Sequence, residues 1–106
     1  MIAKHKRIVN KKLLNEMKAI DYCERCGNTR YIENAHIISR GAGGPDIREN
    51  IARLCGPASC GMGCHGSQHK GNISKDELFL IVARREGKTL EAIKEIVNKA
   101  WRLNDG

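Results

Sequence analysis

The sequence has few aromatic residues and no long apolar segment. It contains one Phe, one Trp and two Tyr in 106 residues, so aromatic side chains cannot dominate a core. The longest apolar run covers six residues, 78–83, which is too short to span a membrane. No apolar stretch of signal-peptide length follows the basic amino terminus, so we expect a cytoplasmic protein. We expect one domain over residues 1–106, small enough to gain stability from a bound metal.

Acidic residues are scarce relative to basic ones. The chain has 19 Lys and Arg against 12 Asp and Glu, a net charge of +7. Residues 1–18 hold six of the basic side chains and one acidic side chain. Such a segment favours a polyanionic partner such as nucleic acid, the alternative being a tail that only aids solubility. The basic side chains expected to contact this partner are Lys4, Lys6, Arg7, Lys11 and Lys12.

Apolar periodicity and composition divide the chain into three zones, which together indicate the α+β class. Residues 1–20 are predicted to form a basic helix, because apolar side chains recur there at helical spacing. These side chains are Val9, Leu13, Met17 and Ile20. Residues 21–72 are rich in Cys, His and Gly, and favour short strands and turns, with a strand or hairpin arm at 30–38. Residues 74–103 predict two helices: Ser74 and Glu77 are typical of a helix start, and Gly87 of a helix end.

Five cysteines lie in the middle zone. In a reducing compartment they favour metal binding over disulfides. Cys23 and Cys26 form a C-x-x-C knuckle, and Cys55, Cys60 and Cys64 follow about 30 residues later. Two separated pairs of thiolates are typical of tetrahedral structural zinc. The alternatives are a redox-active pair, for which the surroundings lack a strand–helix pattern, and unrelated free thiols. Spacing alone does not choose among Cys55, Cys60 and Cys64.

Three histidines share this zone with the cysteines. His65 and His69 are four residues apart, so on a helix they share one face and can hold one metal ion. The alternative is two unrelated surface histidines. His36 lies upstream of both. A scaffold that only binds structural zinc has no need for three additional histidines.

The order of these motifs resembles the HNH endonucleases of the ββα-metal fold, in particular the small versions common in bacteriophages and bacteria. The resemblance covers about half of the chain, and the matching segments are 23–26, 35–44, 50–51, 54–55 and 64–69. His36, Asn50 and His65 stand at the three positions that give the family its name. The resemblance implies a zinc-stapled ββα-metal core at about 21–72, flanked by a basic amino-terminal helix and two carboxy-terminal helices.

The resemblance also implies a function and a role for each residue. The protein would be a metal-dependent DNA endonuclease that nicks double-stranded DNA as a monomer with low sequence specificity. His36 would be the general base, and Asn50 would fix the loop or orient that base. His65 and His69 would hold a catalytic divalent ion, with Mn²⁺ favoured over Mg²⁺, Ni²⁺ or Zn²⁺. Arg40 would contact a phosphate. The implied structural zinc ligands are Cys23, Cys26, Cys55 and Cys64, with Cys60 as an alternate for Cys55.

One position departs from the family pattern. Many members carry Asp or His directly before the general base, as a metal ligand, whereas this chain has Ala35. Glu33 would lie on the same face of a strand and can replace it; water and phosphate oxygens, or His69, are the alternatives. A phage packaging protein is a further partner compatible with the resemblance, although the sequence shows no surface for it. The rival interpretation is a non-catalytic zinc module that binds nucleic acid or a protein.

Overall fold

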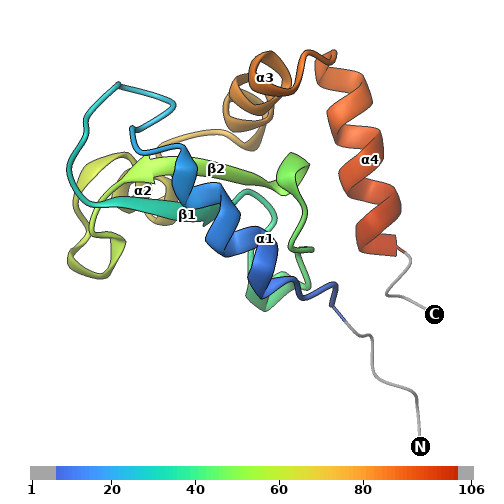
Figure 1. The fold of residues 1–106 in the computed structure, drawn as a ribbon, viewed down its shortest axis with the longest axis horizontal. Helices are drawn as coiled ribbons and strands as arrows, with labels where there is room; N and C mark the ends of the chain where they lie inside the picture. Colours follow the sequence, from blue (N-terminus) through green and yellow to red (C-terminus); the bar gives the residue numbers. More distant parts are fainter. Residues whose placement is uncertain (1–6, 103–106) are drawn as a thin grey trace, which may run out of the picture.

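The computed structural model describes residues 7–102 (Figure 1). Its helices and strands follow the order α1 (Lys11–Glu16), β1 (Ile32–His36), β2 (Ile51–Cys55), α2 (Gly63–His69), α3 (Lys75–Glu86) and α4 (Leu90–Arg102). Short 3₁₀ turns lie at Met17–Ala19, Arg40–Ala42, Arg48–Asn50 and Ala58–Cys60. The predicted α+β class is confirmed. No helix within residues 7–102 combines the length and the apolar character needed to cross a membrane.

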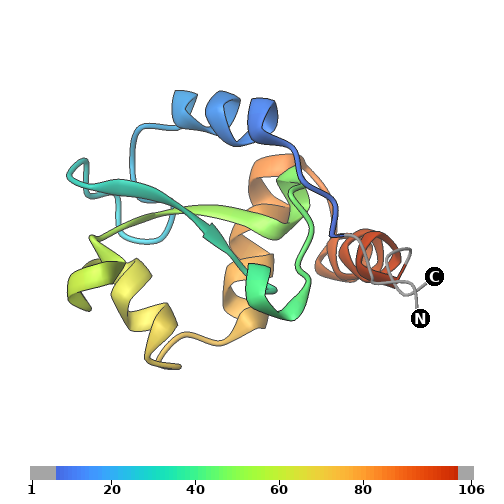
Figure 2. The same cartoon turned by 90° about the horizontal axis from the view of Figure 1, so that it is seen from below.

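The two strands form an antiparallel ribbon at the centre of the molecule. Ile32 pairs with Cys55 at one end of the ribbon, and His36 pairs with Ile51 at the other. Figures 1 and 2 show α1 on one face of this ribbon and α2 on the opposite face. Helix α3 packs beside β2, and α4 packs against α3 on the outside. The ribbon therefore has a different helix on each of its two faces.

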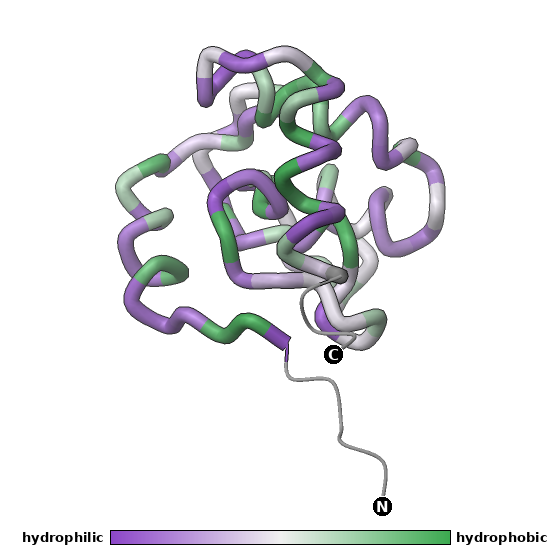
Figure 3. Tube along the Cα trace, turned by 90° about the vertical axis from the view of Figure 1, so that its right-hand side faces the viewer, coloured by the Kyte–Doolittle hydropathy of each residue, from purple (hydrophilic) through white to green (hydrophobic). Residues whose placement is uncertain are grey.

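The core forms where the helices turn their apolar faces toward β2. Every residue of β2 is buried, and the fully buried side chains of the two last helices include Val82, Ile93 and Val97. Hydrophobic and hydrophilic residues alternate around the helical turns in Figure 3, as expected of helices that bury one face. Burial of these apolar stripes is the main favourable contribution to folding.

The predicted boundaries of the carboxy-terminal helices agree closely with the structure. Ser74 accepts a hydrogen bond from the Glu77 backbone N–H (3.1 Å) at the start of α3, and Gly87 ends the helix in the left-handed conformation with φ of 68°. Thr89 caps α4 through the Ala92 N–H (3.1 Å). The Glu77 carboxylate does not complete a capping box, because it binds Arg25 (2.7 Å).

The predicted amino-terminal helix is much shorter than residues 1–20. Helix α1 begins at Lys11, where the Asn10 side chain caps it by accepting from the Leu13 N–H (3.0 Å). Residues 7–10 are not helical, and Val9, which we expected on the apolar stripe, is 59% exposed. Met17 is the residue that anchors this region, with no exposed surface. Residues 1–6 lie outside the described part of the chain.

Candidate functional site

Four cysteines converge at the end of the ribbon where Ile32 pairs with Cys55. Cys23 and Cys26 come from a turn before β1, Cys55 ends β2, and Cys64 lies in the first turn of α2. Their four Sγ atoms all lie within 4.8 Å of one another, and Cys26 Sγ is 3.7 Å from Cys55 Sγ. Tetrahedral zinc with Zn–S bonds of about 2.3 Å separates its sulfurs by about 3.8 Å. This cysteine cluster therefore fits a structural metal such as zinc. Cys60 is exposed on its own turn and outside the cluster.

The surroundings of the cysteine cluster supply donors to sulfur. The backbone N–H groups of Cys26 and Cys64 point at Cys23 Sγ and Cys55 Sγ, each at 3.4 Å, and Arg25 donates to Cys64 Sγ at 3.6 Å. Although burial acts to raise it, the backbone donors bring the pKa of Cys23 down to about 7. Burial raises the pKa of Cys64 to about 12. A bound cation would be the natural replacement for that proton, because metal ligands bind as thiolates.

The predicted histidines line one pocket between α2 and the end of the ribbon where His36 pairs with Ile51. His36 ends β1, whereas His65 and His69 project from α2, and Arg40 comes from the turn after β1; the pocket they line has a volume of about 300 Å³. Its remaining lining residues are Asn34, Ser39 and Gly41. The His65 and His69 rings meet edge to face, with centroids 4.6 Å apart. The shared helix face predicted for these two residues is confirmed. We refer to this cavity as the histidine pocket.

His36 is held by a carboxylate that the sequence analysis missed. Its Nε2 lies 2.8 Å from Asp46 Oδ1, and the Asp46 side chain has no exposed surface. Burial lowers the pKa of His36, and Asp46 opposes that change. Although burial alone would raise the pKa of Asp46, the hydrogen bond from Arg7 lowers it. Asp46 follows Gly-Gly-Pro in the sequence, so it resembled an ordinary turn residue.

His65 is held in a similar way by Glu33. Its Nδ1 lies 2.8 Å from Glu33 Oε1, which also accepts from the Ala58 N–H (3.0 Å). Burial lowers the pKa of His65, and Glu33 acts in the opposite direction. A Cβ atom at Gly56 would lie 2.4 Å from Glu33 Oε1, so only glycine leaves room for this arrangement. Ala35, the position that departs from the family pattern, is completely buried.

Asn50 fixes the loop between the two strands. Its Oδ1 accepts from the Ile38 N–H (2.8 Å), and its Nδ2 donates to the carbonyls of Ile38 and Pro45 (both 3.0 Å). The side chain is completely buried. Of the two roles expected for Asn50, these contacts serve loop fixation. The loop that it closes carries both Arg40 and Asp46.

Five of the six predicted cationic residues fall into three groups, and Arg7 is the sixth. Lys4 and Lys6 lie outside the described residues. Lys11 and Lys12 are exposed on α1. Arg40 is exposed at the histidine pocket and makes no side-chain hydrogen bond or ion pair with the described residues.

Arg7 was expected to be an exposed side chain that contacts DNA, and the structure places it elsewhere. It forms an ion pair with Asp46, and its side chain is 20% exposed. The expectation treated the basic terminus as a solvated arm, whereas the buried Asp46 carboxylate requires a cationic partner. Arg7 is therefore part of the structure around His36.

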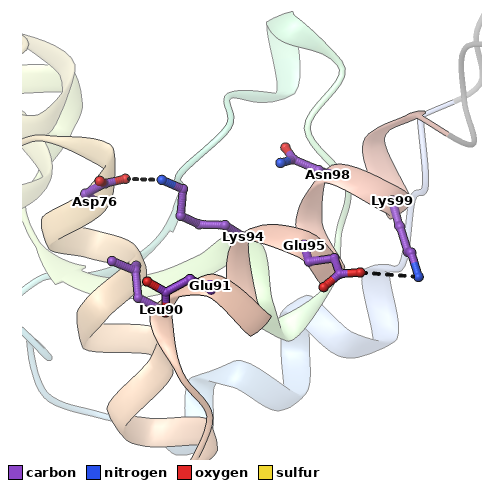
Figure 4. A pocket seen from close by; sticks show the side chains of 7 residues that line it. All are labelled: Asp76, Leu90, Glu91, Lys94, Glu95, Asn98 and Lys99. Atoms are coloured by element: carbon purple, nitrogen blue, oxygen red, sulfur yellow. Dashed lines mark ion pairs between the residues drawn. The ribbon is translucent and has the colours of Figure 1, made fainter.

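A second depression lies far along the chain from the histidines, between α3 and α4 (Figure 4). It has a volume of about 550 Å³. Lys94 pairs with Asp76 across it at 3.0 Å, and Lys99 pairs with Glu95 within α4 at 3.6 Å. None of the residues expected to act in function lines it. We therefore assign the candidate site to the histidine pocket.

Comparison of the chain with protein-family models, with curated proteins and with solved structures found no significant match.

Proposed function

We propose that the protein is a metal-dependent DNA endonuclease of the HNH type. The observation that carries this proposal is the histidine pocket itself, where His36, His65, His69 and Arg40 meet although they come from three segments of the chain. The order strand, strand, helix supports it, because β1, β2 and α2 supply the residues that the resemblance assigns to the core. The cysteine cluster, whose Cys64 directly precedes His65, would serve as its structural zinc site.

His36 would act as the general base. Asp46 holds its Nε2 (2.8 Å), and an ionised carboxylate accepts hydrogen bonds only, so the proton lies on Nε2 and the lone pair on Nδ1. Nδ1 can take a proton from water as the water oxygen attacks the phosphorus. The bond from phosphorus to the 3′ oxygen then breaks, and that oxygen takes a proton from solvent. Burial, which lowers the pKa of His36, keeps the ring neutral near pH 7, as a base requires.

His65 and His69 would bind the catalytic divalent ion. When bound, such an ion neutralises charge on the scissile phosphate. Because Glu33 holds Nδ1 of His65 (2.8 Å), Nε2 is the nitrogen left for the ion. Glu33 then orients a ligand, which is the usual role of a carboxylate behind a metal-binding histidine. Imidazole ligands favour Mn²⁺ over the harder Mg²⁺.

Arg40 and α1 supply the cations that DNA binding needs. Arg40 can donate to a phosphate oxygen beside the histidines, because its guanidinium has no partner among the described residues. Helix α1 lies along the strand that carries His36, since Asn34 donates to the Leu14 carbonyl (3.1 Å). Its exposed Lys11 and Lys12 would contact the backbone on that side. Backbone contacts carry no sequence information, so we expect low specificity and, from one site, single-strand nicks.

The test is single-turnover relaxation of a supercoiled plasmid by wild-type protein and His36→Ala at saturating Mn²⁺. We expect His36→Ala to lose about 10²- to 10⁴-fold in rate, with unchanged zinc content and with the protein still folded at the assay temperature. Asn98→Ala, in the depression of Figure 4, is the control and should cleave like the wild type. Mg²⁺ should support slower cleavage than Mn²⁺. Equal rates for wild type and His36→Ala would instead favour a non-catalytic zinc module.

A further inference from the structure

We propose that Asp46 and Arg7 are positioning residues that fix the orientation and the tautomer of His36, so that the amino-terminal segment (residues 7–10) is part of the active site. The catalytic consequence of this inference rests on the proposed function. The structural part, which concerns the state of the His36 ring, does not.

The Asp46 carboxylate is surrounded by donors. Its Oδ1 lies 2.8 Å from His36 Nε2 and 2.5 Å from Arg7 Nη1, and its Oδ2 accepts from the Asn10 backbone N–H at 2.9 Å. The Asp46 side chain has no exposed surface, and that of His36 is 9% exposed. A buried charge of this kind is retained only where its partners satisfy it. His36 is thus one of three donors that share a single carboxylate.

The amino-terminal segment is attached to the same loop at two further points. The Asp46 N–H donates to the Ile8 carbonyl (2.8 Å), and Arg7 Nη1 also donates to the Gly44 carbonyl (2.9 Å). A Cβ atom at Gly44 would lie 1.7 Å from the Ile38 carbonyl oxygen, so only glycine allows the loop to pack this closely at that position. The amino-terminal segment is therefore connected to His36 by hydrogen bonds through Asp46, in addition to any contact it makes with nucleic acid.

Asp46 and Arg7 shift the pKa of His36 in opposite directions. Asp46 favours the protonated ring, whereas Arg7 and Arg40 disfavour it, and burial disfavours it most. His65 and His69 face the same pocket, and the Gln68 amide donates to the His36 carbonyl oxygen (2.9 Å) from α2. Loss of Asp46 should lower the pKa of His36 and release the Nε2–H tautomer. Loss of Arg7 should raise that pKa.

The experiment is NMR of the imidazole nitrogens of His36 in the zinc-loaded full chain, titrated with pH, for wild type, Asp46→Asn and Arg7→Met. We expect wild type to carry its proton on Nε2. Asp46→Asn should lower the titration midpoint by about one pH unit and populate the Nδ1–H tautomer. Arg7→Met should move the midpoint upward, and Arg7→Lys should restore it. Lys99→Met, which breaks an exposed ion pair on α4, is the control and should change neither property.

The rate of DNA cleavage as a function of pH is a second measurement on the same variants. The rising limb of the pH–rate profile should move in the same direction as the NMR midpoint, and Asp46→Asn should lose roughly 10²-fold or more in rate because its base is held in the wrong tautomer. An unchanged tautomer and midpoint in both variants would overturn the inference even if the wild type cleaves DNA. If Asp46→Asn does not fold, Arg7→Met decides: an unmoved midpoint overturns the inference. A wild-type protein that shows the expected ring state but no cleavage would overturn the proposed function alone.

Discussion

The cysteine cluster and the histidine pocket present metal-binding side chains in contrasting ways. At the cysteine cluster, four sulfur atoms from three segments of the chain lie within 4.8 Å of one another. At the histidine pocket, two imidazoles lie edge to face, and their nearest carboxylate is hydrogen bonded behind one of them. Structural zinc sites are closed by protein ligands, whereas catalytic sites keep positions open for water and substrate. The same small unit thus carries a closed candidate site and an open one.

The closed site also determines where the open one lies. Cys64 and His65 are adjacent in the first turns of α2, and β2 ends at Cys55, beside Cys26. A metal bound to the cysteine cluster would therefore fix the start of α2 relative to the ribbon, and with it the direction of His65 and His69. Substitutions in the cysteine cluster should therefore affect folding, whereas substitutions in the histidine pocket should affect mainly activity.

The largest effect is expected from the cysteine cluster. Cys55→Ser should abolish zinc binding and the cooperative folding of residues 21–72, because structural zinc contributes about 10–16 kcal/mol to folding in small zinc modules. Cys60→Ser, a matched change on an exposed turn outside the cluster, should keep one zinc per chain. Elemental analysis together with thermal melting measures both. Zinc loss in Cys60→Ser but not in Cys55→Ser would show that the ligand set is wrong.

The second largest effect on stability is expected from Asn50, because its buried side chain fixes the loop that carries Arg40 and Asp46. Asn50→Ala removes three buried hydrogen bonds and leaves the Ile38 N–H and two carbonyls without partners. We expect the free energy of unfolding to fall by about 3 kcal/mol, while zinc stays bound. Asn98→Ala, at an exposed position, should change it by less than about 0.5 kcal/mol. Urea unfolding measures the difference. Equal stability of the two variants would mean that the loop does not depend on the Asn50 amide.

The sequence predicted the closed site more completely than the open one. Short-range rules were enough for the knuckle, for the caps at Ser74 and Gly87 and for the helix that pairs His65 with His69. They failed at Asp46 and Arg7, which are 39 residues apart and meet only in the folded chain. A buried ion pair leaves no local pattern, because each partner taken alone looks like a surface residue. The extent of α1 was also misjudged, since periodicity through Val9 continued past the Asn10 cap.

A single hydrogen bond to Glu33 should set how well His65 binds the divalent ion. Glu33→Gln keeps the shape of the side chain but weakens the hold on His65 Nδ1, which is 2.8 Å from the carboxylate. We expect the Mn²⁺ concentration that gives half-maximal cleavage to rise about 10- to 100-fold, with unchanged zinc content. Glu95→Gln, an exposed carboxylate paired with Lys99 on α4, is the matched control. A Mn²⁺ requirement that stays the same in Glu33→Gln would show that Glu33 does not support the metal ligand.

The smallest effect concerns the cations that are proposed to bind DNA. Lys11 and Lys12 are exposed on α1, whereas Arg7 is bound to Asp46. Each lysine that contacts a phosphate contributes about one unit to the slope of log affinity against log salt. The double change of Lys11 and Lys12 to Met should therefore reduce that slope by about two, whereas Arg7→Met should leave it nearly unchanged. Fluorescence anisotropy with a short duplex, from about 50 to 200 mM salt, measures the slope. A reduced slope in Arg7→Met would mean that this guanidinium leaves Asp46 to bind DNA, so that Arg7 does not serve only to hold the base.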